Sequence, residues 1–125
     1  MIKTKKIPFD FVLEKLLPLQ PEVKPMFGSF AVYVGEKIML ILRQRESYPE
    51  DNGVWIATSQ QYHESLRKQF PIRSIIAFGP GETSWQVLPE SENQFESKAT
   101  EICDLILKYD ERIGRIPKKK KKKLK

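Results

Sequence analysis

The chain has 125 residues, of which 40% are hydrophobic and 30% charged, a balance typical of a globular protein and unlike that of a disordered or fibrous one. The formal net charge is +6, but residues 118–125 contain seven lysines, and the rest of the chain has 15 basic against 16 acidic residues. The basic character therefore belongs to the C-terminal tail, and the composition of the body gives no sign of nucleic-acid binding.

The length and the residue pattern predict one domain over residues 1–116, followed by a disordered lysine-rich tail over residues 117–125. No stretch approaches the about 20 apolar residues that a membrane-spanning helix needs, and no cleavage site follows the basic N-terminus. The only cysteine, Cys103, excludes an intramolecular disulfide, which agrees with a reducing compartment. We therefore expect a cytoplasmic protein without a membrane contact.

The first predicted element is a short helix over residues 9–17, because four apolar residues fall on one helical face: Val12, Leu13, Leu16 and Leu17. Prolines then keep the connection to about residue 25 extended. A β-hairpin follows, with strands over residues 27–34 and 38–43 around a turn that contains Gly35. Gly28, near the start of the first strand, indicates a bulge or a close approach of another stretch of backbone.

Three more strands are predicted further along the chain, over residues 54–57, 72–78 and 84–88. Between the first two of these, Thr58 and Gln61 form a capping-box pattern. A helix is therefore predicted from about Thr58 to Phe70, where Pro71 ends it.

The last predicted helix begins after Ser91, which forms a second capping-box pattern with Gln94, and it ends before Gly114. Its apolar residues recur every three or four positions: Phe95, Ala99, Ile102, Ile106, Tyr109 and Ile113. This stripe covers fewer than three heptads, so packing on the sheet is favoured over a coiled coil. The stripe or a sheet face is also the predicted contact of a homodimer.

The predicted order is α-β-β-β-α-β-β-α, which indicates an α+β fold with a mostly antiparallel five-stranded sheet. This order resembles the TfoX N-terminal domain-like family over roughly residues 22–108. The matching residues are Met26-Phe27-Gly28, Tyr33, Gly35, Ile38 to Leu42, Trp55 and Trp85-Gln86-Val87-Leu88-Pro89-Glu90. Ser29 departs from the family pattern, which has a second glycine there. The resemblance implies a fold similar to the small secretion-chaperone architecture and a non-enzymatic interaction or regulatory role.

Few residues are candidates for catalysis. His63, the only histidine, neighbours Glu64, which points away from it on a helix, so we expect a solvated histidine. Cys103 lies among apolar helix positions and is expected to be a core thiol. One histidine and one cysteine provide no zinc cluster. We therefore expect no catalytic residue, no metal and no cofactor.

Six aromatic residues fall on predicted strands: Phe27, Phe30, Tyr33, Trp55, Phe78 and Trp85. We expect them to pack in the core rather than to stack on nucleic-acid bases, because the strands carry few basic residues. The alternative function is a small-molecule-binding module or an enzyme. Its groove would lie near the start of the first strand and be formed by Lys24, Met26, Phe27, Trp55 and Trp85.

The tail provides a second candidate site, for polyanions, formed by Lys118, Lys119, Lys120, Lys121, Lys122, Lys123 and Lys125. One interpretation is a tail that only keeps the chain in solution. The other is weak nucleic-acid binding without sequence preference, through neutralisation of phosphates. The sequence therefore predicts an interaction or regulatory domain with an unknown protein partner and weak nucleic-acid contact through the tail.

Overall fold

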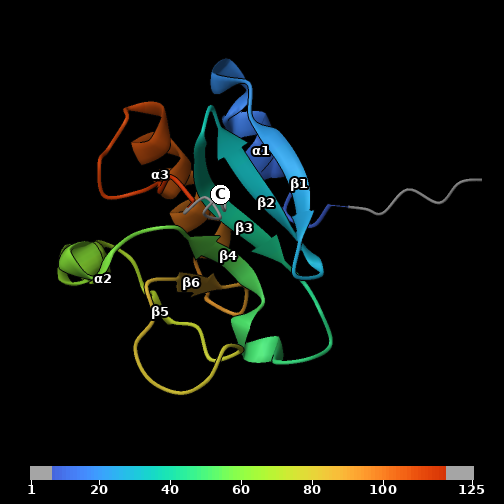
Figure 1. Cartoon of the computed structure of the whole chain (residues 1–125), viewed down its shortest axis with the longest axis vertical. Helices are drawn as coiled ribbons and strands as arrows, with labels where there is room; N and C mark the ends of the chain where they lie inside the picture. The colour runs from blue at the N-terminus through green and yellow to red at the C-terminus, as the bar shows by residue number, and fades with distance from the viewer. Residues whose placement is uncertain (1–6, 118–125) are drawn as a thin grey trace, which may run out of the picture.

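Six strands form one antiparallel sheet in the computed structural model of this chain, which describes residues 7–117. The strands are β1 (Glu22–Met26), β2 (Ser29–Val34), β3 (Lys37–Arg43), β4 (Gly53–Ile56), β5 (Arg73–Ser74) and β6 (Gln86–Pro89). Their order across the sheet is β1-β2-β3-β4-β6-β5. The helices are α1 (Phe11–Lys15), α2 (His63–Gln69) and α3 (Phe95–Leu107). Figure 1 shows α2 on the side of the molecule away from β1.

The prediction of an α+β fold with an antiparallel sheet is confirmed, but the five strands and the element order are wrong. The additional strand is β1, which lies at the edge of the sheet and pairs Val23 with Val32 and Lys24 with Ala31. Pro25 has no N–H group, so it fits a strand only where one side of the backbone needs no partner. The prolines of this segment made it resemble a connection in the sequence.

The Met26-Phe27-Gly28 motif is a turn rather than the start of a strand. Met26 pairs with Ser29 across a two-residue connection, in which Phe27 and Gly28 both have positive φ, 52° and 74°. These values fit a type I′ turn, whose twist matches that of the flanking strands. The structure has neither the predicted bulge nor a close backbone approach at Gly28, whose nearest neighbour is the Arg45 side chain, with Cζ 2.7 Å from the position of an added Cβ.

Both faces of the sheet bury apolar side chains. The face that packs against α1 and α3, here called the helix face, holds the larger part of the core. The opposite face has a smaller buried cluster: Ala31, Ile38, Ile41, Trp55, Ala57, Ile75 and Val87. Alternation along the central strands separates the two sets, so that Leu40 and Val54 face the helices while Ile41 and Trp55 face away. Strand β3 is covered on both faces, since its residues from Ile38 to Arg43 are all buried.

The apolar stripe of α3 packs on the sheet as predicted, since its members within the helix are buried: Phe95, Ala99, Ile102 and Ile106. These side chains are therefore not free for a homodimer contact. The helix ends at Leu107, well before Gly114. The N–H of Tyr109 donates to the carbonyl oxygen of Ile106 at 2.9 Å, and that of Asp110 donates to Leu105 at 3.0 Å. With Tyr109 in the left-handed conformation, the two bonds form a Schellman motif.

Neither predicted capping box forms. Oγ1 of Thr58 donates instead to the carbonyl oxygen of Arg112 at 2.6 Å, and a 3-10 turn over Gln60–Tyr62 precedes α2. The N-cap residue of α3 is Gln94, and its side chain makes no capping hydrogen bond. Of the helices in residues 7–117, none is long and apolar enough to cross a membrane.

The chain returns to the sheet after α3. Ile38 and Arg115 exchange two backbone hydrogen bonds, of 2.9 and 3.0 Å, and the N–H of Gly114 donates to the carbonyl oxygen of Ala57 at 2.7 Å. Arg115 thus lies beside the start of β3, just past the end of β4. This pairing holds residues 115–117 next to the opposite face of the sheet.

Candidate binding groove

A groove of about 340 Å³ lies on the opposite face of the sheet. Its walls are mostly apolar or aromatic: Met26, Phe27, Tyr33, Ile38, Trp85 and Ile116. Three polar side chains lie among them: Thr58, Ser84 and Arg115. An apolar hollow with a few polar groups is the usual form of a small-molecule site, and this volume is near the lower end of the usual range.

The walls of the groove come from segments that are far apart in the sequence. Met26 and Phe27 belong to the β1–β2 turn, and Ser84 and Trp85 precede β6. The third wall, residues 115–117, is in place because Arg115 pairs with the start of β3. Sequence reasoning found the first two walls through the Met26-Phe27-Gly28 motif and the tryptophan. It missed the third, since no local pattern predicts this pairing.

Four aromatic rings lie beside the groove on the same face, and we call them the aromatic row: Trp85, Trp55, Phe78 and Phe27. Successive ring centroids in this order are 5.8, 5.6 and 5.4 Å apart. Trp55 is only 2% exposed and supports the row from within the core, whereas Phe27 and Phe78 are 61% and 52% exposed. Neighbouring exposed rings on a protein surface indicate an interaction site.

Two of the three polar groups of the groove, Ser84 and Arg115, stand at its rim, whereas Thr58 is buried. Nη1 of Arg115 donates to Oγ of Ser84 at 3.1 Å, so the guanidinium reaches across from one wall to another. Nζ of Lys24 lies 4.8 Å from the ring centroid of Tyr33, a cation–π contact on the β1 side. The groove therefore combines apolar walls with two cationic side chains near its edges.

The loop that carries Phe78 is held by Asp51, whose side chain is completely buried. Its Oδ2 accepts hydrogen bonds from the backbone N–H groups of Ile76 and Ala77, at 2.9 and 2.8 Å. Its Oδ1 accepts from Nη1 of Arg73 at 3.0 Å. A buried carboxylate with three donors fixes the loop, so the aromatic row is in place before a ligand arrives. The sequence showed Asp51 only as one acid in a polar loop, with no signal for this role.

Arg43 holds the loop between β3 and β4 in a similar way, through hydrogen bonds. It is 3% exposed, and it donates to Oδ1 of Asn52 and to the carbonyl oxygens of Ser47 and Tyr48, at 2.8, 2.8 and 3.0 Å. Burial lowers the pKa of its guanidinium, while the charge of Asp51 acts in the opposite direction. These hydrogen bonds give the buried cation a structural role beneath the row.

The structure places the five residues of the predicted groove on one face of the sheet. Met26, Phe27 and Trp85 line the groove. Lys24 lies over Tyr33 at its edge. Trp55 does not line it, because this side chain is buried under Trp85 and Phe78. The predicted polyanion site, Lys118 to Lys125, lies outside the described residues and starts directly after the groove residue Pro117.

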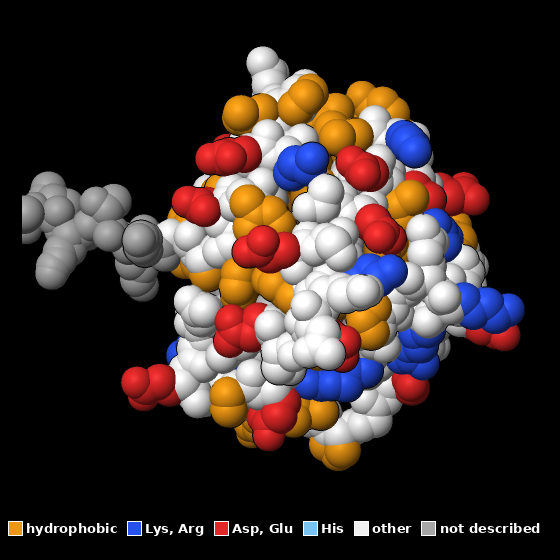
Figure 2. Space-filling view, turned by 180° about the vertical axis from the view of Figure 1, so that it is seen from behind, with side chains coloured by type: hydrophobic (Ala, Val, Ile, Leu, Met, Phe, Trp, Pro, Cys, Tyr) orange, Lys and Arg blue, Asp and Glu red, His pale blue; other side chains and the backbone are white. Residues whose placement is uncertain are grey.

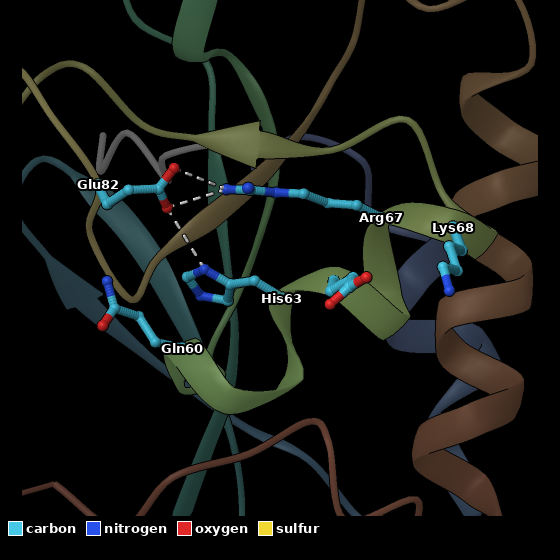
Figure 3. A pocket seen from close by; sticks show the side chains of 6 residues that line it. Gln60, His63, Arg67, Lys68 and Glu82 are labelled. Atoms are coloured by element: carbon cyan, nitrogen blue, oxygen red, sulfur yellow. Dashed lines mark hydrogen bonds and ion pairs between the residues drawn. The ribbon is translucent and has the colours of Figure 1, made fainter.

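A second hollow, of about 570 Å³, lies beside α2 and is lined by Gln60, His63, Glu64, Arg67, Lys68 and Glu82. The prediction of a solvated histidine is wrong, because His63 is 5% exposed. As Figure 3 shows, Glu82 lies between Arg67 and His63, with its Oε1 3.5 Å from Nδ1 of His63. Among residues 7–117, Nε2 of His63 is buried and has no hydrogen-bond partner. This nitrogen is closed to solvent, whereas Nδ1 faces Glu82, which also lines the hollow.

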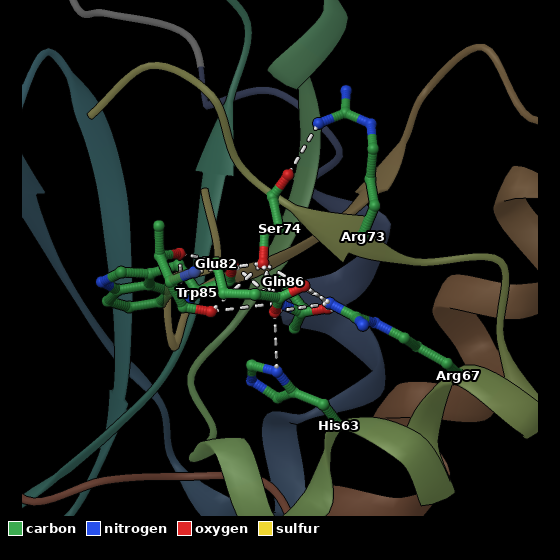
Figure 4. Close-up of polar contacts among 8 residues, drawn as sticks. His63, Arg67, Arg73, Ser74, Glu82, Trp85 and Gln86 are labelled. Carbon is green, nitrogen blue, oxygen red and sulfur yellow. Dashed lines mark hydrogen bonds and ion pairs between the residues drawn. The ribbon is translucent and has the colours of Figure 1, made fainter. Parts of the chain in front are cut away.

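Arg67 and Glu82 belong to a polar network that ties α2 to the β5–β6 connection (Figure 4). Nη2 of Arg67 donates to Oε1 of Gln86 at 2.7 Å and to Oε1 of Glu82 at 3.1 Å. Oγ of Ser74 also donates to Glu82, at 3.0 Å. The hydrogen bond from Arg67, followed by that from Ser74, lowers the pKa of Glu82. Because these side chains satisfy one another, we assign the network to the fold rather than to a site.

Cys103 is a fully buried core thiol, as predicted. Burial raises its pKa to about 12, so the nucleophilic thiolate is scarce at neutral pH. Within residues 7–117, no group of three or more His, Cys, Asp and Glu side chains could hold a metal ion. Comparison of the chain with models of protein families, with curated proteins and with solved structures gave no match.

Charges of both signs are mixed over the face of the molecule that is turned away from the viewer in Figure 1. Figure 2 shows acidic and basic side chains interspersed there, with apolar side chains between them. This agrees with the nearly balanced charge of the body without its tail. Electrostatic attraction of a polyanion by this face is therefore weak.

Proposed function

We propose that this chain is a non-enzymatic binding domain whose groove takes an amphipathic ligand. The flat or apolar part of the ligand lies against Met26, Trp85 and Ile116, and an anionic group lies at Arg115. The observation that carries the proposal is the guanidinium of Arg115 at the rim of an apolar hollow. A guanidinium forms strong, directional hydrogen bonds with a carboxylate, sulfonate or phosphate.

The groove is also ready for a ligand without a large rearrangement. Asp51 fixes the loop of the aromatic row, and the bridge between Ile38 and Arg115 fixes the C-terminal wall. Binding to a preformed site avoids the entropic cost of ordering these loops. A regulatory role follows if the bound ligand changes how the face contacts a partner protein.

The test uses anilinonaphthalene sulfonate, a flat aromatic anion whose fluorescence rises in an apolar environment. Ile116→Asp places a negative charge in the apolar wall, and we expect it to weaken dye binding at least tenfold, since the charge must be desolvated and repels the sulfonate. Arg115→Gln should weaken binding about threefold to tenfold, through loss of a charge-assisted hydrogen bond. The measurement is a fluorescence titration of each variant.

Leu17→Asp is the matched control, because Leu17 is exposed to a similar extent, 63% against 59% for Ile116, and does not line the groove. Thermal unfolding of all variants verifies that they fold. Equal dye affinity of Ile116→Asp and the wild type would remove the proposal.

We also propose that the chain is related to the TfoX N-terminal domain-like family. The proposal is supported by the Met26-Phe27-Gly28 motif, which forms the β1–β2 turn at the groove, and by Trp85 on its other wall. A second candidate function is weak polyanion binding by the lysines of residues 118–125. The position of Pro117 favours polyanion binding, because Pro117 lines the groove and the lysines follow it directly in the sequence.

A further inference from the structure

Building on the groove proposed above, we infer that its ligand is single-stranded nucleic acid. The bases stack on the groove and the aromatic row, and the phosphates lie along the basic side chains around them. Single strands expose flat bases next to an anionic backbone, which is the combination that this face accommodates. Duplex nucleic acid hides its bases and does not fit an aromatic groove.

The aromatic side chains on this face are available for stacking. The sequence predicted that they pack in the core, which is correct for Trp55 and wrong for Phe27 and Phe78. Phe27 protrudes from the β1–β2 turn, and Phe78 lies on the β5–β6 connection rather than on a strand. Tyr33 and Trp85 line the groove between β2 and that connection. Sheet faces that bind single strands use two or three such rings.

Basic side chains flank this aromatic surface. Nη1 of Arg45 donates to the carbonyl oxygen of Phe27 at 3.0 Å, so its guanidinium lies at one end of the row. Arg115 lies at the rim of the groove, and Lys24 lies over Tyr33. Base stacking was not expected from the sequence because the predicted strands carry few basic residues. Arg45 and Arg115 come from outside the strands.

On strand β1, the side of the sheet that carries Lys24 also carries the acidic residue Glu22. Glu22 is directly opposite Tyr33 in the β1–β2 register, so it points to the face that carries Tyr33. Glu22 is exposed at the sheet edge, where solvent screens its repulsion of a phosphate. Asp51, the acid beneath the aromatic row, is paired with Arg73 at 3.0 Å, so Lys24, Arg45 and Arg115 leave the surroundings of the groove positive.

The tail adds the positive charge that the body lacks. Its seven lysines begin directly after Pro117, which lines the groove. Lysines neutralise phosphates whatever the bases, so their charge adds affinity without base preference, while the groove selects unpaired bases.

The test measures fluorescence anisotropy of a labelled oligothymidylate of about 10 nucleotides, and of a duplex of the same length, with the full chain. Phe27→Asn is the main variant. Asn-Gly is the favoured sequence of a type I′ turn, so this substitution removes the ring and keeps the turn. Tyr109→Asn is the matched control, because Tyr109 also has a left-handed φ, 60°, is 76% exposed and does not line the groove.

We expect the oligothymidylate to bind more tightly than the duplex. Phe27→Asn should weaken its binding about fivefold or more, the usual effect of losing one stacked base, and Tyr109→Asn should leave it unchanged. Deletion of residues 118–125 should reduce the slope of log K against log salt concentration by up to about 5, because seven lysines no longer displace counterions. Phe27→Asn should still weaken the binding that remains.

Three results would overturn the inference. The first is equal affinity for the single strand and the duplex. The second is full affinity of Phe27→Asn together with complete loss after deletion of the tail, and the third is the absence of oligothymidylate binding. The second result would assign binding to the lysines alone. Dye binding that depends on Ile116, combined with no oligothymidylate binding, would keep the amphipathic groove and reject nucleic acid as its ligand.

Discussion

At the scale of single residues, Gly53 has no room for a side chain. Gly53 begins β4 with φ of 143° and pairs with Pro89 of β6. A Cβ at this position would lie 2.1 Å from the carbonyl oxygen of Leu88, which is backbone and cannot move aside. Glycine is therefore required here for space as well as for backbone conformation.

We predict that Gly53→Ala lowers the free energy of unfolding by about 4 kcal/mol or more, because β4 must separate from β6 to admit the methyl group. Gly79→Ala is the control, since Gly79 also has a left-handed φ, 117°, with nothing within 4 Å of its added Cβ. Gly79→Ala should lower the free energy of unfolding only by the cost of the left-handed backbone conformation, about 1–3 kcal/mol. Urea denaturation of both variants measures the difference, and equal losses would contradict the steric explanation.

At the scale of elements, the loops around the groove depend on buried charged side chains rather than on regular secondary structure. Asp51 binds the start of the β5–β6 connection, and Arg43 binds the β3–β4 loop. The indole Nε1 of Trp55 donates to the carbonyl oxygen of Asp51 at 2.8 Å, which joins this anchor to the aromatic row. Loop positions near the groove are thus set by contacts between segments distant in sequence.

We predict that Asp51→Ala costs about 2–4 kcal/mol, because two partly buried N–H groups and Arg73 lose their acceptor. The amide hydrogens of Ile76 and Ala77 should also exchange faster than other amides of the sheet. Hydrogen exchange followed by NMR measures both effects. Asp104→Ala, at an exposed position of α3, is the control and should change stability by less than about 0.5 kcal/mol. Unchanged exchange at Ile76 would show that the carboxylate does not hold the loop.

At the scale of the whole molecule, the C-terminal segment connects the helix layer with the sheet. Asp110 and Arg112 follow α3, and Arg112 donates to Oγ of Ser65 on α2 at 2.6 Å. The side chain of Arg112 also donates to Asp110, and this hydrogen bond is the largest cause that lowers the pKa of Asp110. The same contact raises the pKa of Arg112.

This contact predicts how stability changes with pH. A carboxyl group whose pKa is lower in the folded than in the unfolded chain stabilises the fold fully at neutral pH, and this contribution is lost as pH falls below about 4 through the folded pKa. Asp110→Asn should therefore unfold more easily at neutral pH and show a shallower loss of stability on acidification than the wild type. Thermal unfolding from neutral pH to about pH 3 measures this. Glu14→Gln, at an exposed site of α1, is the control, and parallel curves for Asp110→Asn and wild type would contradict the prediction.

The sequence by itself determined the fold class, most strand positions and the buried stripe of α3. These follow from local periodicity and from glycine and proline signals, which depend on residues a few positions apart. It also indicated Met26, Phe27 and Trp85 as groove residues, through a short motif and the tendency of tryptophan to stay partly exposed. The edge strand β1 was missed because its prolines are typical of a connection, although a strand that pairs on one side only tolerates them.

Only the tertiary structure decided which side chains meet. It buried Trp55 and His63, exposed Phe27 and Phe78, and brought Arg115 to the groove through its pairing with Ile38. It also gave Asp51 its role as a buried acceptor for a loop about 25 residues away. Burial and contacts between distant segments depend on the packing of the complete chain, so no local pattern contains them.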